Sequence, residues 1–242
     1  MKNIFITGAS RGIGRAVALE FGKVECNLFL NSLTGGVKLD SVKGEIEKFR
    51  SQEKVGGTVT LRPGDVGDPD SVRSIFEGVN VDILINNAGI SHIGLVQDMS
   101  DEQWRRVIDV NLSAVHYCSK AVIPHMLAAG GGRIINISSV WGVTGASCEV
   151  AYSAAKGGVN AYTRALAKEL APSGIAVNAI ACGCIDTDMN AHFSDDEKRE
   201  LCEEIPAGRF AKPEEAAGLV AALCEQSTYL TGQVIGFDGG WM

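Results

Sequence analysis

The sequence predicts an α/β fold, a single-domain, doubly wound parallel sheet of about seven strands with helices on both faces. Three observations predict it. Short runs rich in β-branched and aliphatic residues alternate with longer helical segments along the 242 residues. Most of these runs are continuously apolar, which is typical of parallel strands covered on both faces. No repeat, low-complexity tract or linker interrupts the alternation, so we expect one domain over residues 1–242.

The expected strands and helices alternate along most of the chain. We place strands at residues 3–7, 27–31, 58–62, 81–86, 133–138, 176–181 and 232–237. We place helices at residues 12–22, 37–52, 70–77, 101–129, 152–171, 195–204 and 213–224. Pro124 is expected to kink the longest helix, because proline removes a backbone donor. A small substrate-loop insertion is expected around residues 189–212.

Composition and the N-terminal residues exclude several classes of protein. A formal net charge of −7 argues against binding to nucleic acid, whose phosphate backbone attracts a basic surface. No apolar run approaches the ~18 residues that span a bilayer, so we expect no membrane partner. The first residues enter a strand-like run without a signal-peptide pattern, so we expect a cytoplasmic location.

The seven cysteines are scattered along the chain and are expected to be mostly reduced core residues. The only cluster that suggests a metal ion is Cys182 and Cys184, with His192 and Cys202 nearby in the sequence. Its C-x-C spacing is not that of a usual zinc site. We therefore expect no metal.

A glycine-rich stretch, Thr7-Gly8-Ala9-Ser10-Arg11-Gly12-Ile13-Gly14, joins the first strand to the first helix. Glycines there allow a tight turn and let the backbone approach a pyrophosphate, which the free N–H groups of a helix N-terminus attract. The spacing is G-x-x-x-G-x-G rather than the commoner G-x-G-x-x-G. The position directly after the first strand favours a dinucleotide site over a plain turn. The expected contacts are Gly8, Ser10, Arg11, Gly12, Ile13 and Gly14.

The end of the second strand indicates which dinucleotide binds. An acidic residue there would hold the ribose 2′-hydroxyl of NAD, but the strand ends in Asn31-Ser32. Arg11 is placed to meet a 2′-phosphate instead. We therefore favour NADP(H), with NAD(H) as the alternative, and expect Asn31 and Ser32 beside the ribose. Asp65 and Val66, after the third strand, are expected at the adenine; their alternative role is a turn before the next helix.

Tyr152 and Lys156 lie one helical turn apart on one face of the predicted helix. A free phenol ionises near pH ~10, which makes it a poor acid or base at neutral pH. A nearby cation favours the phenolate and lowers that pKa, so the pair could move a proton in catalysis. The alternative is an exposed helix with a packed tyrosine.

Taken together, these motifs resemble the short-chain dehydrogenase/reductases of the classical type. The resemblance covers essentially the whole chain. It rests on residues 7–14, on Asn86-Asn87-Ala88-Gly89, on Asn111, on Ser139, and on Tyr152 with Lys156, which follow Ser139 at the spacing typical of that family. Thr187-Asp188-Met189 and Phe237-Asp238-Gly239-Gly240 are most similar to the bacterial 3-oxoacyl-acyl-carrier-protein reductases. The family implies a Rossmann-like fold.

The resemblance also implies roles for the motif residues. Tyr152 would be the general acid, and Lys156 would bind the nicotinamide ribose and lower the Tyr152 pKa. Ser139 would hydrogen-bond the developing alkoxide. Asn111 would hold a water that relays protons through Lys156; its alternative is a helix kink or a buried polar contact. On the cofactor side, the residues expected are Asn87, Ala88, Gly89, Gly183, Ile185 and Thr187.

The activity implied is NADPH-dependent reduction of a 3-ketoacyl thioester to a 3-hydroxyacyl thioester, in a homotetramer or homodimer. Three features depart from that group. Cys182 stands where the family usually has proline. The arginines expected to meet an acyl-carrier protein before the fifth and sixth strands are absent. The third is the loop from Trp141 to Val150, whose Trp141 and Glu149 are expected to face the substrate together with Met189. Glu149 would disfavour an anionic substrate.

Two alternatives remain. The segments 139–142, 145–150 and 186–192 also resemble a sister group that reduces the 5-aminopentanone modification on a lysine of elongation factor P. That substrate is cationic, and an acidic protein presents it. The alternative of another class is an NADP-binding regulator without catalysis. The presence of Asn111, Ser139, Tyr152 and Lys156 argues against it, because a regulator would not need groups that move a proton.

Overall fold

The computed structural model describes residues 1–191 and 193–242; His192 lies outside the described residues. It confirms the predicted doubly wound sheet. Seven strands, all parallel, lie in the order β3-β2-β1-β4-β5-β6-β7. They are β1 (Lys2–Ile6), β2 (Cys26–Leu30), β3 (Val59–Leu61), β4 (Ile83–Asn86), β5 (Gly132–Ser139), β6 (Ile175–Cys182) and β7 (Val234–Phe237).

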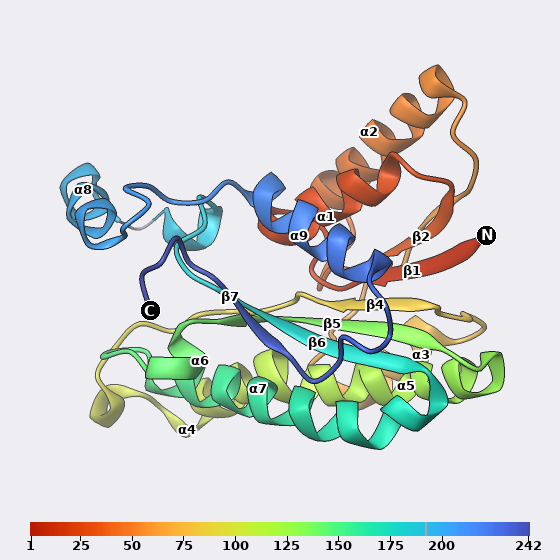
Figure 1. Cartoon of the computed structure of the whole chain (residues 1–242). Helices are drawn as coiled ribbons and strands as arrows, with labels where there is room; N and C mark the ends of the chain where they lie inside the picture. Colours follow the sequence, from red (N-terminus) through yellow and green to blue (C-terminus); the bar gives the residue numbers. More distant parts are fainter. Residues whose placement is uncertain (192) are drawn as a thin grey trace.

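Helices cover both faces of the sheet (Figure 1). One face carries α1 (Gly12–Gly22), α2 (Val37–Glu53) and α9 (Pro213–Glu225). The other carries α3 (Pro69–Phe76), α4 (Asp101–Ile108), α5 (Ala114–Ala129), α6 (Trp141–Thr144) and α7 (Val150–Leu170). Helix α8 (Asp195–Glu204) stands beyond the carboxyl ends of the strands.

The structure shows two features of the helices that were not predicted. The helix expected at residues 101–129 is interrupted by a π-helical turn at Asp109–Ser113, which separates α4 from α5. Pro124 lies inside α5 and does not end it. The segment after β5, for which no helix was expected, contains the short helix α6. The other helices and strands lie within two residues of their predicted bounds.

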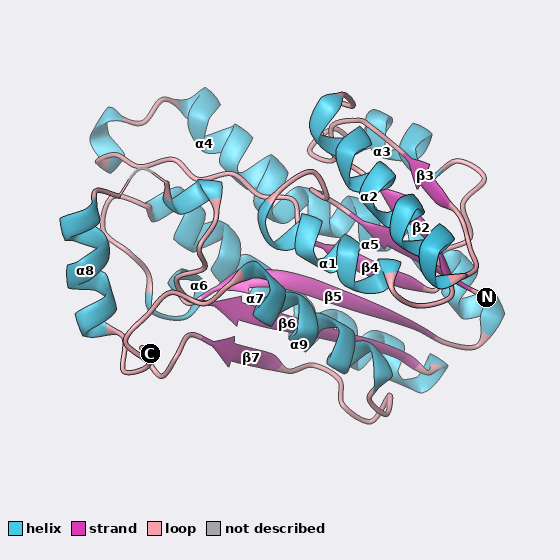
Figure 2. Ribbon diagram, turned by 90° about the horizontal axis from the view of Figure 1, so that it is seen from above, coloured by secondary structure: helices cyan, strands magenta, loops and turns pink. Residues whose placement is uncertain are grey.

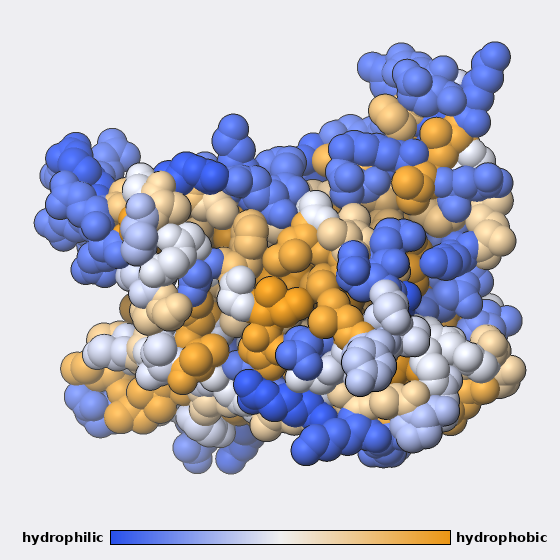
Figure 3. Space-filling model, in the orientation of Figure 1, coloured by the Kyte–Doolittle hydropathy of each residue, from blue (hydrophilic) through white to orange (hydrophobic). Residues whose placement is uncertain are grey.

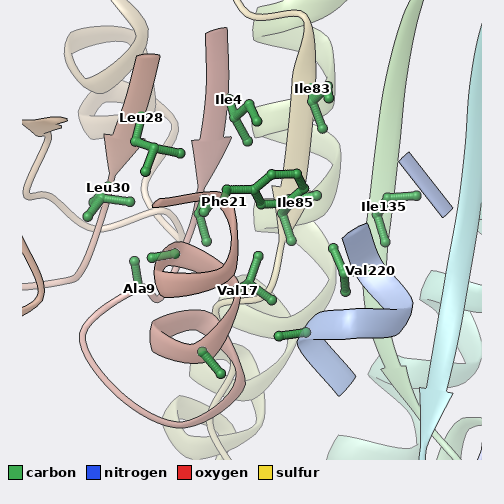
Figure 4. Packing of buried hydrophobic residues seen from close by; sticks show 14 of the residues in the cluster. Ile4, Ala9, Val17, Phe21, Leu28, Leu30, Ile83, Ile85, Ile135 and Val220 are labelled. Carbon is green, nitrogen blue, oxygen red and sulfur yellow. The ribbon is translucent and has the colours of Figure 1, made fainter. Parts of the chain in front are cut away.

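The sheet separates two apolar cores. Figure 4 shows one of them, where Val17 and Phe21 of α1 and Val220 of α9 point toward strand residues such as Ile85. The second core lies under α3, α5 and α7 and contains Phe5, stacked on Phe76 with ring centroids 4.2 Å apart. The continuous apolar runs of the central strands arise from this burial on both sides.

Helix α7 is fixed to strand β5 by polar contacts as well as apolar ones. Asn136 donates to the Thr163 hydroxyl at 2.9 Å, and Ser138 donates to the Asn160 side chain at 2.7 Å. Lys156 donates to the carbonyl of Ile137 at 2.8 Å. These α7 residues lie about one turn apart, on the face that meets the sheet. The contacts set both the rotation and the height of α7.

The strands end together at one edge. In Figure 2 the arrowheads of β6 and β7 point toward the side where α6, α8 and the C-terminus lie. Ser139, at the end of β5, is paired in register with Cys182, at the end of β6. Open parallel sheets bind their ligands at this edge.

Hydrophilic residues cover α2 and α8 in Figure 3, whereas apolar residues gather between α9 and β7. Among the latter, Leu219, Leu230, Ile235 and Phe237 are only partly buried. In the part of the chain that the structure describes, no helix is both long and apolar enough to cross a bilayer.

A buried arginine joins three elements near the amino ends of the strands. The Arg50 side chain of α2 is 5% exposed. Its guanidinium donates to the carbonyls of Gly22 at 3.0 Å, Val24 at 3.2 Å and Thr58 at 3.4 Å. It therefore satisfies carbonyls that the end of α1 leaves without a helical partner.

We expect Arg50→Met to lower the free energy of unfolding by about 2–4 kcal/mol, because buried carbonyls lose their charged donor. The measurement is urea unfolding followed by circular dichroism. Arg73→Met, which breaks an exposed pair with Asp70, is the control and should change stability by less than about 0.5 kcal/mol. Equal effects of the two substitutions would contradict this role for Arg50.

Candidate active site

A cleft of about 310 Å³ lies at the carboxyl edge of the sheet. It brings together residues that the sequence places more than 180 positions apart, from Gly8 to Met189. Of the predicted site residues, only Gly14 and Asn111 are outside its lining. The predicted residues that line it are Gly8, Ser10, Arg11, Gly12, Ile13, Asn31, Ser32, Asp65, Val66, Asn87, Ala88, Gly89, Ser139, Trp141, Glu149, Tyr152, Lys156, Gly183, Ile185, Thr187 and Met189.

The glycine-rich loop is packed too closely for side chains at two positions. Gly8 has φ of +65°, and a Cβ there would lie 2.9 Å from the Cα of Ala88. A Cβ on Gly14 would lie 2.2 Å from the carbonyl oxygen of Gly8. Gly14 thus acts by letting α1 approach the loop. Arg11, the N-cap residue of α1, makes no side-chain capping bond, and the first helical residues, Gly12 and Ile13, line the cleft, where an anion could bind.

Asn87 and Thr7 tie the loop after β4 to the glycine-rich loop. The Asn87 side chain donates to the carbonyls of Thr7 at 3.0 Å and Gly8 at 3.1 Å. The Thr7 hydroxyl accepts from the backbone N–H groups of Asn87 and Ala88 at 2.9 and 3.0 Å. These contacts hold two neighbouring strand ends as one rigid wall of the cleft.

The residues expected at the adenosine line the cleft but are partly engaged by the protein itself. Asn31 donates to the carbonyls of Arg62 and Gly64, at 2.8 and 3.1 Å, so its side chain ties β2 to the segment after β3. Asp65 accepts from Arg106 of α4 at 2.6 Å and from the N–H of Gly67 at 2.9 Å. The sequence reasoning missed Arg106, which also lines the cleft.

Tyr152, Ser139 and Lys156 meet at the centre of the cleft. Ser139 is buried at the end of β5, and its hydroxyl is hydrogen-bonded to the Tyr152 phenol. The Lys156 ammonium lies 5.6 Å from the centroid of the Tyr152 ring. The i, i+4 spacing on α7 therefore does place the phenol and the ammonium side by side, with the serine opposite them.

The pKa of the phenol does not follow the sequence expectation. Burial raises the pKa of Tyr152 above its usual value, and the nearby Glu149 carboxylate raises it further. The hydrogen bond with Ser139 opposes this shift. Burial also lowers the pKa of Lys156 to about 8. A lowered Tyr152 pKa was thus wrong for the protein alone, because loss of hydration and the Glu149 carboxylate raise that pKa more than the Ser139 hydrogen bond lowers it.

Asn111 lies in the π-helical turn and is fully buried. Its side chain donates to the carbonyls of Val107 at 2.8 Å and Ile90 at 2.9 Å, and it accepts from the N–H of Ile90 at 3.2 Å. The bond to Val107 takes a carbonyl that a regular helix would use, so a wider turn results. Asn111 is here a buried polar contact that holds the loop after β4.

The mouth of the cleft is formed by side chains from several loops. Trp141 packs edge-on against Trp241, with ring centroids 5.1 Å apart. The Glu149 carboxylate accepts from the Ser91 hydroxyl at 2.6 Å. Ser91 and Trp241 also line the cleft, and the sequence contained no motif that indicated either. Cys148, beside Glu149, has φ of +62°, a left-handed backbone that only glycine adopts without strain.

Cys182 is buried next to Lys156 and lines the cleft. Burial raises the pKa of its thiol to about 12, so it stays protonated at neutral pH. Over residues 1–191 and 193–242, no group of His, Cys, Asp and Glu is arranged to hold a metal ion.

Comparisons with known proteins agree with this geometry. Residues 2–198 match the short chain dehydrogenase family. An uncharacterized oxidoreductase, YmfI of Bacillus subtilis, is 36% identical over 99% of this chain and 98% of its own length. The 3-oxoacyl-(acyl-carrier-protein) reductase FabG of Aquifex aeolicus is 39% identical over 97% and 95% of the two chains.

A solved structure extends the likeness to three dimensions. It is of a protein from Beutenbergia cavernae assigned as an NAD(P)-dependent gluconate 5-dehydrogenase, with NADP bound. The two chains superpose with a TM-score of 0.89 at 33% identity, over 99% of this chain and 96% of the other. The match to the family and the near full-length relatives leave one assignment: the chain belongs to the short-chain dehydrogenase/reductase family of oxidoreductases.

Proposed function

We propose that this protein reduces a ketone to a secondary alcohol with NADPH. The observation that carries the proposal is the group formed by Ser139, Tyr152 and Lys156. A hydroxyl, a phenol and an ammonium converge there at the inner end of a cleft lined by a glycine-rich loop. This arrangement supplies a proton donor and hydrogen-bond donors to one carbonyl oxygen.

NADP(H) is the cofactor that the site fits. Gly8, Ser10 and Gly12 line the cleft at the N-terminus of α1, where a pyrophosphate would bind, and Arg11 offers a positive charge where β2 brings no acidic residue. When bound, the cofactor supplies the hydride for the carbonyl carbon. Lys156 would bind the ribose hydroxyls, and Ile185 and Thr187, which also line the cleft, would contact the cofactor.

The raised pKa of Tyr152 suits the reducing direction. The phenol remains protonated at neutral pH, so it can give its proton to the carbonyl oxygen as the carbon accepts the hydride. Ser139 donates a hydrogen bond to that oxygen. We propose that Asn111 and Lys156 return a proton to Tyr152 through water, and that Asn111 also fixes the nearby loop.

Tyr152→Phe should lower kcat about 10²–10⁴-fold, because it removes the proton donor and leaves the ring in place. The Kd for NADPH, measured by fluorescence, should stay within about twofold of the unchanged protein. Tyr162→Phe, on the same helix but away from the cleft, is the control. If Tyr152→Phe kept the kcat of the unchanged protein, this role for Tyr152 would be refuted. If the unchanged protein oxidised no NADPH with any of a panel of carbonyl compounds, the NADP-binding regulator would be favoured instead.

The lowered pKa of Lys156 predicts that kcat/KM depends on pH. Its pKa is lowered to about 8, so it is charged below that pH and neutral above it. We expect kcat/KM for ketone reduction to fall as the pH rises through about 8, since the neutral amine no longer attracts the developing alkoxide. The pH profile should be measured at saturating NADPH. A rate that rises between pH 7 and 9 would contradict this role.

The first substrate we propose is a 3-ketoacyl thioester, reduced to the 3-hydroxyacyl thioester. Near full-length similarity to a 3-oxoacyl-(acyl-carrier-protein) reductase supports it. The apolar rings of Trp141 and Trp241 at the mouth of the cleft could contact an acyl chain. An acyl-carrier protein would then be the partner, although this chain lacks the basic residues expected for that contact.

A second substrate is favoured by one feature, the Glu149 carboxylate. It lines the cleft beside Tyr152, and Ser91 holds it in place at 2.6 Å. A carboxylate there attracts a cationic group, and the two tryptophan rings of the mouth can contact an ammonium through their faces. The 5-aminopentanone modification on a lysine of elongation factor P carries such a charge, so it is the second candidate.

Glu149→Gln separates the two substrates. For aminopentanone-modified elongation factor P, kcat/KM should fall about tenfold, which equals ~1.4 kcal/mol of lost attraction. For acetoacetyl thioester it should stay equal or rise, because glutamine still accepts from Ser91. Asp186→Asn, an exposed charge outside the cleft, is the control. An equal change for both substrates would show that Glu149 does not select substrate charge.

We propose that subunits associate as dimers or tetramers. The partly buried apolar residues between α9 and β7 lie at an unpaired edge of the sheet (Figure 3), where a second copy could cover them.

A further inference from the structure

One carboxylate at the edge of the cleft pairs with two cations from different parts of the chain. The Oδ2 atom of Asp188 lies 3.7 Å from Arg11 Nη1 and 3.6 Å from Lys38 Nζ. Arg11 follows β1, Lys38 is the second residue of α2, and Asp188 begins the short 3₁₀ helix η4 (Asp188–Asn190). The two cations therefore converge on a single anion.

The position of this anion matters because Lys38 reaches it from α2, the helix that follows β2. In a doubly wound sheet the ribose of the adenosine lies at the end of that strand. The strand is followed by Asn31 and Ser32 and then by a loop that leads into α2 and Lys38. Residues 31–32 contain neither Asp nor Glu, and the two cations meet the carboxylate of Asp188 instead.

We propose that Asp188 is an internal competitor of the 2′-phosphate of NADP(H), and that Lys38 is a second cation for that phosphate together with Arg11. The carboxylate marks the point where both cations can reach one anion. The phosphate then replaces the carboxylate between them. This inference concerns cofactor binding, so it holds whichever ketone the protein reduces.

Charge and exposure favour such an exchange. A phosphate monoester carries about −1.5 to −2 charges near neutral pH, against −1 for a carboxylate. The side chains of Arg11, Lys38 and Asp188 are all more than half exposed. Ion pairs of this kind are weak, so a stronger anion can break them. NADH has no 2′-phosphate and leaves Asp188 paired.

The exchange has a consequence on the substrate side. Asp188 precedes Met189, which lines the cleft. The rest of the turn is held by Asn190, whose side chain donates to the carbonyl of Ile185 at 2.8 Å. Release of Asp188 removes two contacts that join η4 to the cofactor wall. NADPH, unlike NADH, thus loosens the segment that borders the substrate.

The test uses Asp188→Asn, which keeps the shape of the side chain and removes its charge. Calorimetry gives the Kd for NADPH and NADH, and for the probes adenosine 2′,5′-bisphosphate and 5′-AMP. Because two exposed ion pairs are lost, the Kd values of NADPH and of the bisphosphate should fall by about 3- to 10-fold. NADH and 5′-AMP should change by less than about twofold, since they lack the 2′-phosphate.

Lys38→Gln should raise the Kd values of NADPH and of the bisphosphate by about 5-fold and leave the Kd of NADH unchanged. Lys43→Gln, on the same helix but paired with Glu47, is the matched control and should change no Kd. In the double variant of Lys38 and Asp188, the gain from Asp188→Asn should shrink. Hydrogen exchange at residues 188–190 should rise with NADPH more than with NADH.

Two results would overturn the proposal. If Asp188→Asn changes the Kd of NADPH and that of NADH by the same factor, Asp188 acts on a chemical group that both cofactors contain and not on the 2′-phosphate. If Lys38→Gln leaves the Kd of the bisphosphate unchanged, Arg11 alone meets the phosphate. These measurements are binding constants, so a failure of the proposed ketone reduction would leave them interpretable.

Discussion

The contact between strand β5 and helix α7 is the constraint on which the active site depends. Asn136 and Ser138 bond the Thr163 and Asn160 side chains, and Lys156 bonds the carbonyl of Ile137. Polar groups buried in this way are costly unless they meet their partners, so α7 has one favourable position on the sheet. That position brings Tyr152 to Ser139. Lys156 is thus also part of the framework that positions its neighbour Tyr152.

Much of the fold could be predicted because apolar periodicity reports burial directly. The strands are apolar on both faces, and helices such as α1 and α8 begin and end at the expected residues. The motif residues could also be placed at one edge, because parallel strands end together. Their spacing along the chain was therefore sufficient to predict the centre of the cleft.

What the sequence did not predict depends on contacts between distant residues. Asn111 widens a helix because its side chain competes for the carbonyl of Val107, which periodicity does not reveal. Helix α6 is only one turn long and rests against α7, where a Cβ on Gly142 would lie 2.6 Å from the Lys156 backbone. The direction of the Tyr152 pKa shift required knowledge of its burial and of Glu149.

The two halves of the cleft are built differently, and this explains why the reaction is better determined than the substrate. The cofactor side consists largely of backbone, glycines and tightly bonded amides such as Asn87. The substrate side consists of side chains from α6, the following loop and the C-terminal residues, including Trp141, Glu149 and Trp241. Such loops accept substitution without loss of the fold, so one framework can serve many ketones.

The π-helical turn at Asp109–Ser113 also sets how α5, the helix that follows it, is rotated about its axis relative to α4. Each residue of an α-helix advances the chain by about 100° around the axis. If the turn became regular helix with all its residues kept, the extra residue that it absorbs would rotate α5 by about that angle relative to α4. Cys118, Val122 and Met126 would then leave the core. Substitutions that straighten this segment are therefore restricted by helical phase.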